Sequence, residues 1–166
     1  MMSGLNTVKN TDYHRAVNAD RQAAGVERWP LPALLRAARA AFAARIGEAL
    51  ERAGFDDLPA NGPYVLGAIS RTGAPLAAVI RQLGVSKQSA GQLVDALVAR
   101  DYLDRHVDPA DRRRLMVVLT ERGEAAAAVI SDAVEGVEAV LAERAGTEDL
   151  RTTRRTLAAL IEPGLE

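Results

Sequence analysis

Polar side chains suited to contact DNA recur along residues 86–100 with the spacing of one helix face. If this segment is helical, its inner stripe is apolar: Val85, Ala90, Leu93, Val94 and Leu97. The outer positions are Lys87, Gln88, Gly91, Gln92 and Asp95, with Ser89 near the boundary. Lysine pairs with phosphate or guanine, glutamine forms two hydrogen bonds to adenine, and serine donates to phosphate. The residues predicted to contact duplex DNA are therefore Ser86, Lys87, Gln88, Ser89 and Gln92.

Gly91 is an unusual residue for this position. Glycine inside a helix costs about 1 kcal/mol relative to alanine. A close approach to a DNA backbone, or to another helix, would explain why a glycine stands here.

A second basic group follows in the chain. Arg112 and Arg113 lie between two segments rich in large apolar or β-branched residues, 102–107 and 114–119, and Arg114 begins the second segment. With Asp108-Pro109-Ala110-Asp111 between the segments, the pattern predicts a β-hairpin with a basic tip. Such arginines suit an adjacent minor groove, where the potential is most negative. Asp111 is expected to hold Arg113 in position rather than to contact DNA.

Two residues of the first predicted strand have other interpretations. Arg105 either contacts phosphate, and is included among the DNA-binding residues, or pairs with Asp104 or Asp108. His106 is expected to be exposed to solvent, without a ligand role.

These groups need elements to position them. Leu76, Val79, Ile80 and Leu83 follow helical spacing, Gly84 ends that helix, and Ser86 can cap the next one by accepting a backbone hydrogen bond. Two helices joined by such a tight turn form a helix-turn-helix, in which the first helix braces the second in a major groove.

Further helices are predicted on both sides of this unit. An amphipathic helix begins after Trp29-Pro30 and stops near Gly54, and a short buried helix covers residues 63–69. Thr120 caps a long helix that Gly146 interrupts, and a last helix ends before Pro163. Residues 1–28 are polar, weakly periodic and interpreted as an N-terminal extension, with a single domain over 29–166.

Composition excludes several classes of protein. The chain of 166 residues has no cysteine and only two histidines, which removes disulfides and thiolate metal sites and disfavours a metal sensor. No apolar run is long enough to span a membrane, and no signal peptide is recognisable, so a soluble cytoplasmic protein is expected. No phosphate loop or nucleophile–base arrangement indicates an enzyme, and no cofactor or metal is expected.

The net charge of −1 hides an uneven distribution. Residues 60–119 carry eight Lys/Arg against five Asp/Glu, whereas the rest of the chain carries 13 against 17. A mildly basic middle segment between acidic flanks is compatible with binding to nucleic acid.

The segment from about Leu76 to Ala125 resembles the MarR family of winged-helix regulators. The resemblance rests on residues 108–113, Asp-Pro-Ala-Asp-Arg-Arg, followed by Val-Val-Leu-Thr-Glu-Arg-Gly at 117–123. The segments 83–86 and 93–97 agree with the family's recognition region. The fold expected from this resemblance is mainly α with a small β-hairpin wing: a winged helix-turn-helix lobe over about 60–120 and dimerisation helices over about 31–53 and 120–162.

The resemblance also implies a function. MarR-like proteins are homodimers that bind palindromic operators in double-stranded DNA, and many repress transcription until a small phenolic or aromatic ligand releases them. A similar effector site would use aromatic walls and a cation, for which the candidates are Trp29, Arg36, Arg39, Phe42 and Tyr64. An alternative is a winged-helix fold that binds other proteins instead of DNA.

Two positions depart from the family's pattern. Gln92 stands where family members commonly have arginine, which puts base preference or affinity in doubt. Asp101 stands where many have glycine in the turn after the recognition helix. Because aspartate tolerates left-handed geometry better than most residues, the same turn is expected with slight strain.

Overall fold

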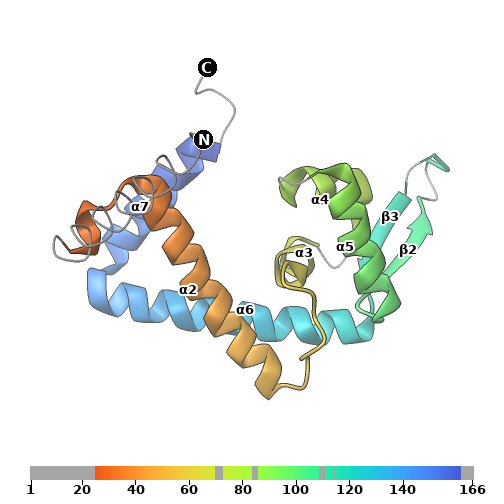
Figure 1. Ribbon diagram of the computed structural model, residues 1–166, viewed down its shortest axis with the longest axis horizontal. Coiled ribbons are helices and arrows are strands. Elements are labelled where there is room, and N and C mark those ends of the chain that lie inside the picture. The colour runs from red at the N-terminus through yellow and green to blue at the C-terminus, as the bar shows by residue number, and fades with distance from the viewer. Residues whose placement is uncertain (1–24, 70–72, 84–85, 109–110, 114, 162–166) are drawn as a thin grey trace, which may run out of the picture. The chain divides into compact units, whose positions relative to one another are not determined.

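The computed structural model describes residues 25–69, 73–83, 86–108, 111–113 and 115–161. They fall into two units, and the boundary lies within one helix, between Ala41 and Phe42. The first unit holds a short 3-10 helix, η1 (Val26–Arg28), and the beginning of α2 (Leu31–Arg52). The second unit holds the rest of α2 and all later elements, which are coloured from ochre to blue in Figure 1. Residues 1–24 of the predicted extension lie outside the described ranges.

The predicted helix-turn-helix and wing are present in the second unit. Its helices α3 (Gly62–Ala68), α4 (Leu76–Leu83) and α5 (Lys87–Ala99) are followed by strands β2 (Leu103–Val107) and β3 (Leu115–Leu119). The hairpin pairs antiparallel, with Leu103 opposite Leu119 and Val107 opposite Leu115. This arrangement confirms the predicted fold class, mainly α with a small antiparallel sheet.

A third strand was not predicted. Residues Ala74–Pro75 form β1, which pairs with Val117 and Met116 and makes β3 the central strand. The sequence Gly-Ala-Pro indicates a chain break rather than a strand. Proline nevertheless fits an edge strand. It has no backbone N–H to donate, and on the outer side of an edge strand no hydrogen bond requires one. Gly73 precedes it with φ +84°, and a Cβ at this residue would lie 2.9 Å from the Val117 carbonyl oxygen.

An aliphatic core joins these elements within the second unit. Tyr102 is the largest fully buried side chain of this core. The core residues come from α2, α3, α4, α5, the sheet and α6: Ile46, Leu50, Val65, Leu66, Val79, Val94, Leu97, Leu103, Val117, Ala126 and Ile130. Because the inner face of α5 packs in this core, the opposite face of the helix points away from the core.

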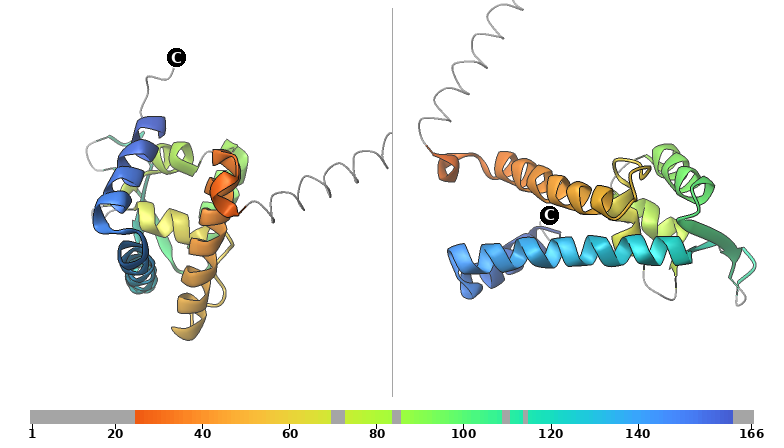
Figure 2. Two further views of the ribbon diagram at one scale, coloured as in Figure 1. Left: turned by 90° about the vertical axis from the view of Figure 1, so that its left-hand side faces the viewer. Right: turned by 90° about the horizontal axis from the view of Figure 1, so that it is seen from below.

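The C-terminal part consists of two helices, α6 (Glu121–Ala145) and α7 (Thr147–Ile161). Thr120 caps α6 as predicted by accepting a hydrogen bond from the Gly123 backbone N–H at 3.0 Å. Gly146, at φ +93°, separates the two helices at the predicted place. Figure 2 shows the hairpin beside the start of α6, and α7 follows from the other end of that helix.

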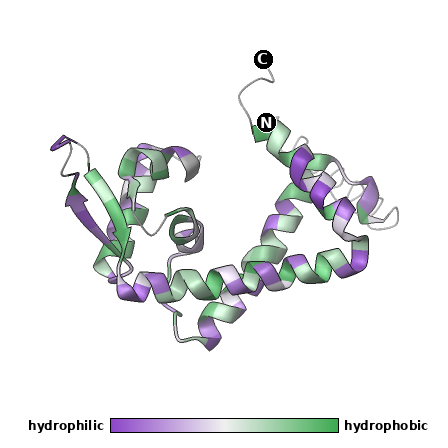
Figure 3. Ribbon diagram, turned by 180° about the vertical axis from the view of Figure 1, so that it is seen from behind, coloured by the Kyte–Doolittle hydropathy of each residue, from purple (hydrophilic) through white to green (hydrophobic). Residues whose placement is uncertain are grey.

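Large apolar side chains of α6 and α7 remain exposed in the single chain. Figure 3 shows hydrophobic and hydrophilic residues alternating along α6. Four exposed members, with their exposed fractions, are Val140 (44%), Leu141 (37%), Leu160 (51%) and Ile161 (81%). Burial of such a surface against another protein is favourable because apolar area leaves water.

Candidate nucleic-acid interface

Helix α5 presents its predicted polar residues outward. Ser86, Lys87, Gln88, Ser89 and Gln92 are all exposed. On the opposite face, Ala90, Val94 and Leu97 are fully buried. The helix therefore has one face in the core and one face available to a partner, as its sequence predicts.

The first turn of α5 is fixed by its serines. The Ser89 backbone N–H donates to Ser86 Oγ at 3.1 Å, and the two hydroxyl oxygens lie 2.8 Å apart. This is the predicted N-cap. Because the capping serines are exposed as well, their hydroxyls remain accessible to a phosphate at the helix N-terminus.

Gly91 has no structural reason to be a glycine among the described residues. A Cβ built at this position meets no heavy atom within 4 Å. The space next to the helix at this position is therefore open, which fits the predicted close approach of an external partner.

The wing carries the basic tip. Arg112 and Arg113 are exposed, and the Arg113 backbone N–H donates to Asp111 Oδ1 at 3.0 Å. Asp111 thus orders the tip, in agreement with its expected role. Arg114, which was predicted to belong to this tip, lies outside the described residues, as do Pro109 and Ala110.

Arg105 has a partner that the sequence did not suggest. Its guanidinium forms an ion pair with Asp95 on the outer face of α5, instead of with Asp104 or Asp108. Asp104 accepts a hydrogen bond from the Arg105 backbone N–H at 2.7 Å. The Arg105 side chain is 30% exposed, and its Nε is buried without a hydrogen-bond partner among the described residues. The residue joins the wing to α5, so a direct phosphate contact is less favoured than a positioning role.

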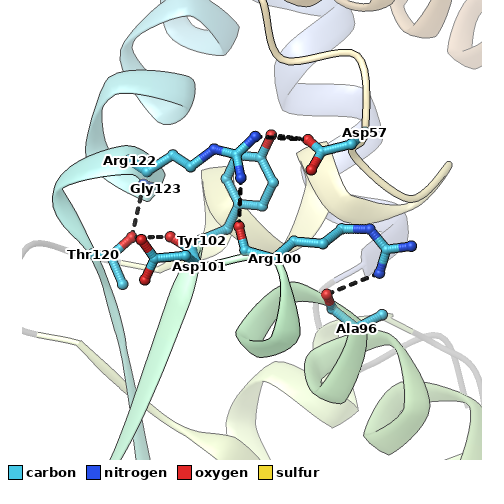
Figure 4. Close-up of polar contacts among 8 residues, drawn as sticks. All are labelled: Asp57, Ala96, Arg100, Asp101, Tyr102, Thr120, Arg122 and Gly123. Atoms are coloured by element: carbon cyan, nitrogen blue, oxygen red, sulfur yellow. Dashed lines mark hydrogen bonds and ion pairs between the residues drawn. The ribbon is translucent and has the colours of Figure 1, made fainter.

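The turn that follows α5 has the expected left-handed residue. Asp101 has φ 61°, the single positive value among the described non-glycine residues. Its carbonyl accepts a hydrogen bond from Thr120 Oγ1 at 2.5 Å (Figure 4). Since Thr120 also caps α6, one side chain links the end of α5 to the start of α6.

A polar cluster beside this turn was not found by sequence reasoning. Tyr102 donates its hydroxyl to Asp57 Oδ1 at 2.5 Å, and Arg122 Nη2 donates to the same oxygen at 2.9 Å. The Arg122 guanidinium lies 4.3 Å from the Tyr102 ring centre, and its Nη1 donates to the Arg100 carbonyl at 2.7 Å (Figure 4). Asp57, Tyr102 and Arg122 are named the clamp below.

The clamp changes the acidity of two of its members. The hydrogen bond from Tyr102, with a further contribution from Arg122, holds the pKa of Asp57 below its ordinary value. Burial, followed by the hydrogen bond to Asp57, raises the pKa of Tyr102 to about 12. At neutral pH the cluster therefore contains a carboxylate, a neutral phenol and a guanidinium.

The second unit also contains a pocket of ≈ 220 Å³. Its walls come from residues 43–51 of α2, the following loop and the start of α3. Phe55 and Tyr64 supply aromatic surface, and Glu51 and Asp56 supply carboxylates. Of the predicted effector residues, Tyr64 lines this pocket, whereas half-buried Phe42 does not. Trp29, Arg36 and Arg39 belong to the first unit.

The described residues hold neither a metal-binding cluster nor a membrane-spanning helix. These residues include no group of three or more His, Cys, Asp or Glu side chains arranged to hold a metal ion. No helix in the described ranges is long and apolar enough to cross a membrane.

Comparison with known proteins finds a family match within this lobe. Residues 56–114 match the MarR family. No curated protein has a sequence that matches the chain.

Solved structures match the fold over most of the chain. A mutant MarR from E. coli complexed with operator DNA is 21% identical, with a TM-score of 0.64, over 82% of this chain and 96% of that chain. A MarR-family transcriptional regulator from Rhodococcus sp. RHA1 is 22% identical, with a TM-score of 0.64, over 79% and 93%. Wild-type apo MarR from E. coli is 20% identical, with a TM-score of 0.58, over 81% and 98%. At these identities the likeness establishes the fold.

Proposed function

We propose that this chain, whose residues 56–114 match the MarR family, regulates transcription by binding duplex DNA sequence-specifically as a homodimer. The observation that carries the proposal is the division of α5 into two faces. One face is fully buried at Ala90, Val94 and Leu97, and the other exposes a lysine, two serines and two glutamines.

Helix α5 and the wing would contact different grooves of the DNA. Helix α5 enters the major groove, where Gln88 and Gln92 can read adenine and Lys87 can pair with guanine or phosphate. The exposed Arg112 and Arg113 of the wing enter the neighbouring minor groove. A structurally similar mutant MarR from E. coli was solved in complex with operator DNA, which supports DNA binding by this fold.

A homodimer is supported by the exposed apolar residues of α6 and α7. Val140, Leu141, Leu160 and Ile161 would leave water when two chains associate. Two lobes related by a two-fold axis then meet two half-sites of a palindrome, about one helical turn apart. We propose repression as the regulatory effect, because a dimer seated on an operator blocks access to the DNA beneath it.

The proposal includes a small aromatic effector. The pocket lined by Phe55 and Tyr64 is large enough for a single aromatic ring with substituents. Its carboxylates, Glu51 and Asp56, favour a ligand with hydrogen-bond donors or positive charge over the carboxylic acid that the sequence suggested. A ligand that binds one arrangement of the lobes more tightly than the other would shift the population away from DNA binding.

The test is selection of binding sites from random duplex DNA, followed by titration of the best site in rising salt. We expect a two-fold symmetric consensus and an affinity that falls steeply with salt, because phosphate contacts release counterions. Light scattering on the same sample should give twice the mass of the chain. Failure to enrich any sequence, with weak binding even at low salt, would contradict the proposal and leave a protein-binding winged helix in its place.

A further inference from the structure

The loop between α2 and α3 faces two different sites. Phe55, Asp56 and Leu58 line the pocket, together with Pro59 and Ala60. Asp57, in the middle of this run, instead accepts hydrogen bonds from Tyr102 and Arg122. The pocket wall and the clamp are thus parts of one short segment of backbone. Phe55 joins them again, since its ring centre lies 6.2 Å from that of Tyr102.

The other side of the clamp holds the end of the recognition helix. Arg100 is the C-cap of α5, and Arg122 donates to its carbonyl. The Tyr102 backbone N–H donates to the Leu97 carbonyl at 2.9 Å, which closes the last turn of α5. A single guanidinium on α6 therefore joins the pocket loop to the last turn of α5 (Figure 4).

We propose that Asp57, Tyr102 and Arg122 are positioning residues through which the pocket wall controls the placement of α5, and thereby the affinity for DNA. This inference rests on the proposed function of α5 as the recognition helix. None of the three residues lies on the outer face of α5 or on the wing tip, so their effect on DNA binding is indirect.

The contacts of the clamp are suited to being broken and remade. The Asp57 and Arg122 side chains are 41% and 36% exposed, and ion pairs at such sites stabilise proteins only weakly. Both donors share one carboxylate oxygen, so a small movement of the loop weakens both bonds together. The Tyr102 ring itself is fully buried in the core.

The first arm of the test measures DNA binding by three variants, Asp57→Asn, Tyr102→Phe and Arg122→Gln, on the site selected with the wild-type protein. We expect affinity to fall by about threefold to tenfold, the effect of losing one partly exposed hydrogen bond to a charged group. The slope of log affinity against log salt should stay unchanged, because no phosphate contact is lost. Arg122→Lys, which keeps the charge but loses the forked geometry, should lose affinity as well.

The second arm fills the pocket without needing its ligand. Gly47 lines the pocket, and a Cβ there meets no heavy atom within 4 Å. Gly47→Leu adds apolar volume, whereas Gly47→Ala is the matched control that removes the glycine alone. We expect Gly47→Leu, but not Gly47→Ala, to change DNA affinity by about threefold or more, and the change to disappear in the Asp57→Asn background.

Each outcome decides between the claims. Clamp variants that bind DNA with wild-type affinity, or a Gly47→Leu effect that adds to that of Asp57→Asn, would overturn this inference and leave the proposed function intact. Clamp variants with lower melting temperatures and undiminished DNA affinity well below those temperatures would show a merely structural role, and would overturn it too. A wild-type protein that selects no DNA would overturn the proposed function and this inference together.

Discussion

The two ends of α5 are built in different ways. At its N-terminal end, Ser86 and Ser89 are held by each other, three residues apart in the chain, and Lys87 and Gln88 between them are exposed. At its C-terminal end, Tyr102 is held by Asp57, 45 residues away, and Arg100 by Arg122, 22 residues away. The comparison indicates that one end is left free to meet a partner while the other end is anchored by tertiary contacts.

The largest expected effect concerns the anchored end. A Cβ at Gly123 would lie 2.0 Å from the Tyr102 carbonyl oxygen, so Gly123→Ala forces α6 away from the α5–β2 turn. We expect a loss of about 3 kcal/mol or more in the free energy of unfolding, measured by chemical denaturation. Gly136→Ala is the control on the same helix, since its Cβ meets nothing within 4 Å, and it should be neutral or stabilising. Equal stability of the two variants would refute the anchoring role of this contact.

Substitutions at the N-terminal end of α5 and in the wing should change the affinity for DNA and leave the stability of the fold unchanged. We expect Arg112→Gln to lower DNA affinity about tenfold at low salt and to reduce the salt slope by about 0.9, the value for one lost phosphate contact on B-DNA. Its melting temperature should stay that of the wild type, because Arg112 is exposed. Arg45→Gln, at an arginine that pairs only with neighbouring Glu48 on α2 in the described contacts, is the control and should leave the slope unchanged. An unchanged slope for Arg112→Gln would remove the wing from the interface.

Arg105 is neither part of the anchored end nor a predicted direct contact in the wing tip. It connects the wing to α5 through an ion pair with Asp95. We expect Arg105→Gln to lower DNA affinity about threefold without altering the salt slope, because an indirect contact releases no counterion. In the Asp95→Asn background the same substitution should have no further effect. A reduced slope for Arg105→Gln would instead assign the residue a phosphate contact.

The smallest effects concern pH. Because the pKa of Tyr102 is raised to about 12, the neutral phenol stabilises the folded state fully below pH 10, and this contribution is lost as the pH rises from about 10 to about 12. The pKa of Asp57 is lowered, so its contribution is present above the ordinary carboxyl range and is lost as the pH falls through it. Melting temperatures of Tyr102→Phe should therefore vary less than those of the wild type between pH 10 and 12. Parallel curves for the two proteins would contradict the assignment.

The anchored end also shows what the sequence could not predict. The reading face of α5, the N-cap at Ser86, the hairpin and the left-handed Asp101 follow from local patterns, because each depends on residues a few positions apart. The clamp depends on Asp57 and Arg122, which are 65 residues apart. Arg122 stands in the motif at 117–123, but nothing in that motif indicates Asp57 as its partner. Likewise, β1 depends on pairing with β3 rather than on the strand propensity of Ala74 and Pro75.

Arg105 shows that a correctly predicted strand does not reveal the partners of its side chains. The alternation of the strand places Arg105 correctly on β2, but its partner is decided by how the sheet packs beside α5. The partners that the sequence suggests are the charges close to it in the chain, Asp104 and Asp108. The effector residues remain a prediction, because a pocket is formed by packing and only Tyr64 of that set lies on the one described here.

The most direct test of the central claim is a comparison of the DNA sequences selected by the wild-type protein and by Gln92→Ala. If α5 reads base edges, the variant should lose its preference at one base pair in each half-site, at a cost of about 1–3 kcal/mol for the original site, while the rest of the consensus and the salt slope are retained. An identical consensus with undiminished affinity would contradict the assignment of α5 as the element that reads DNA.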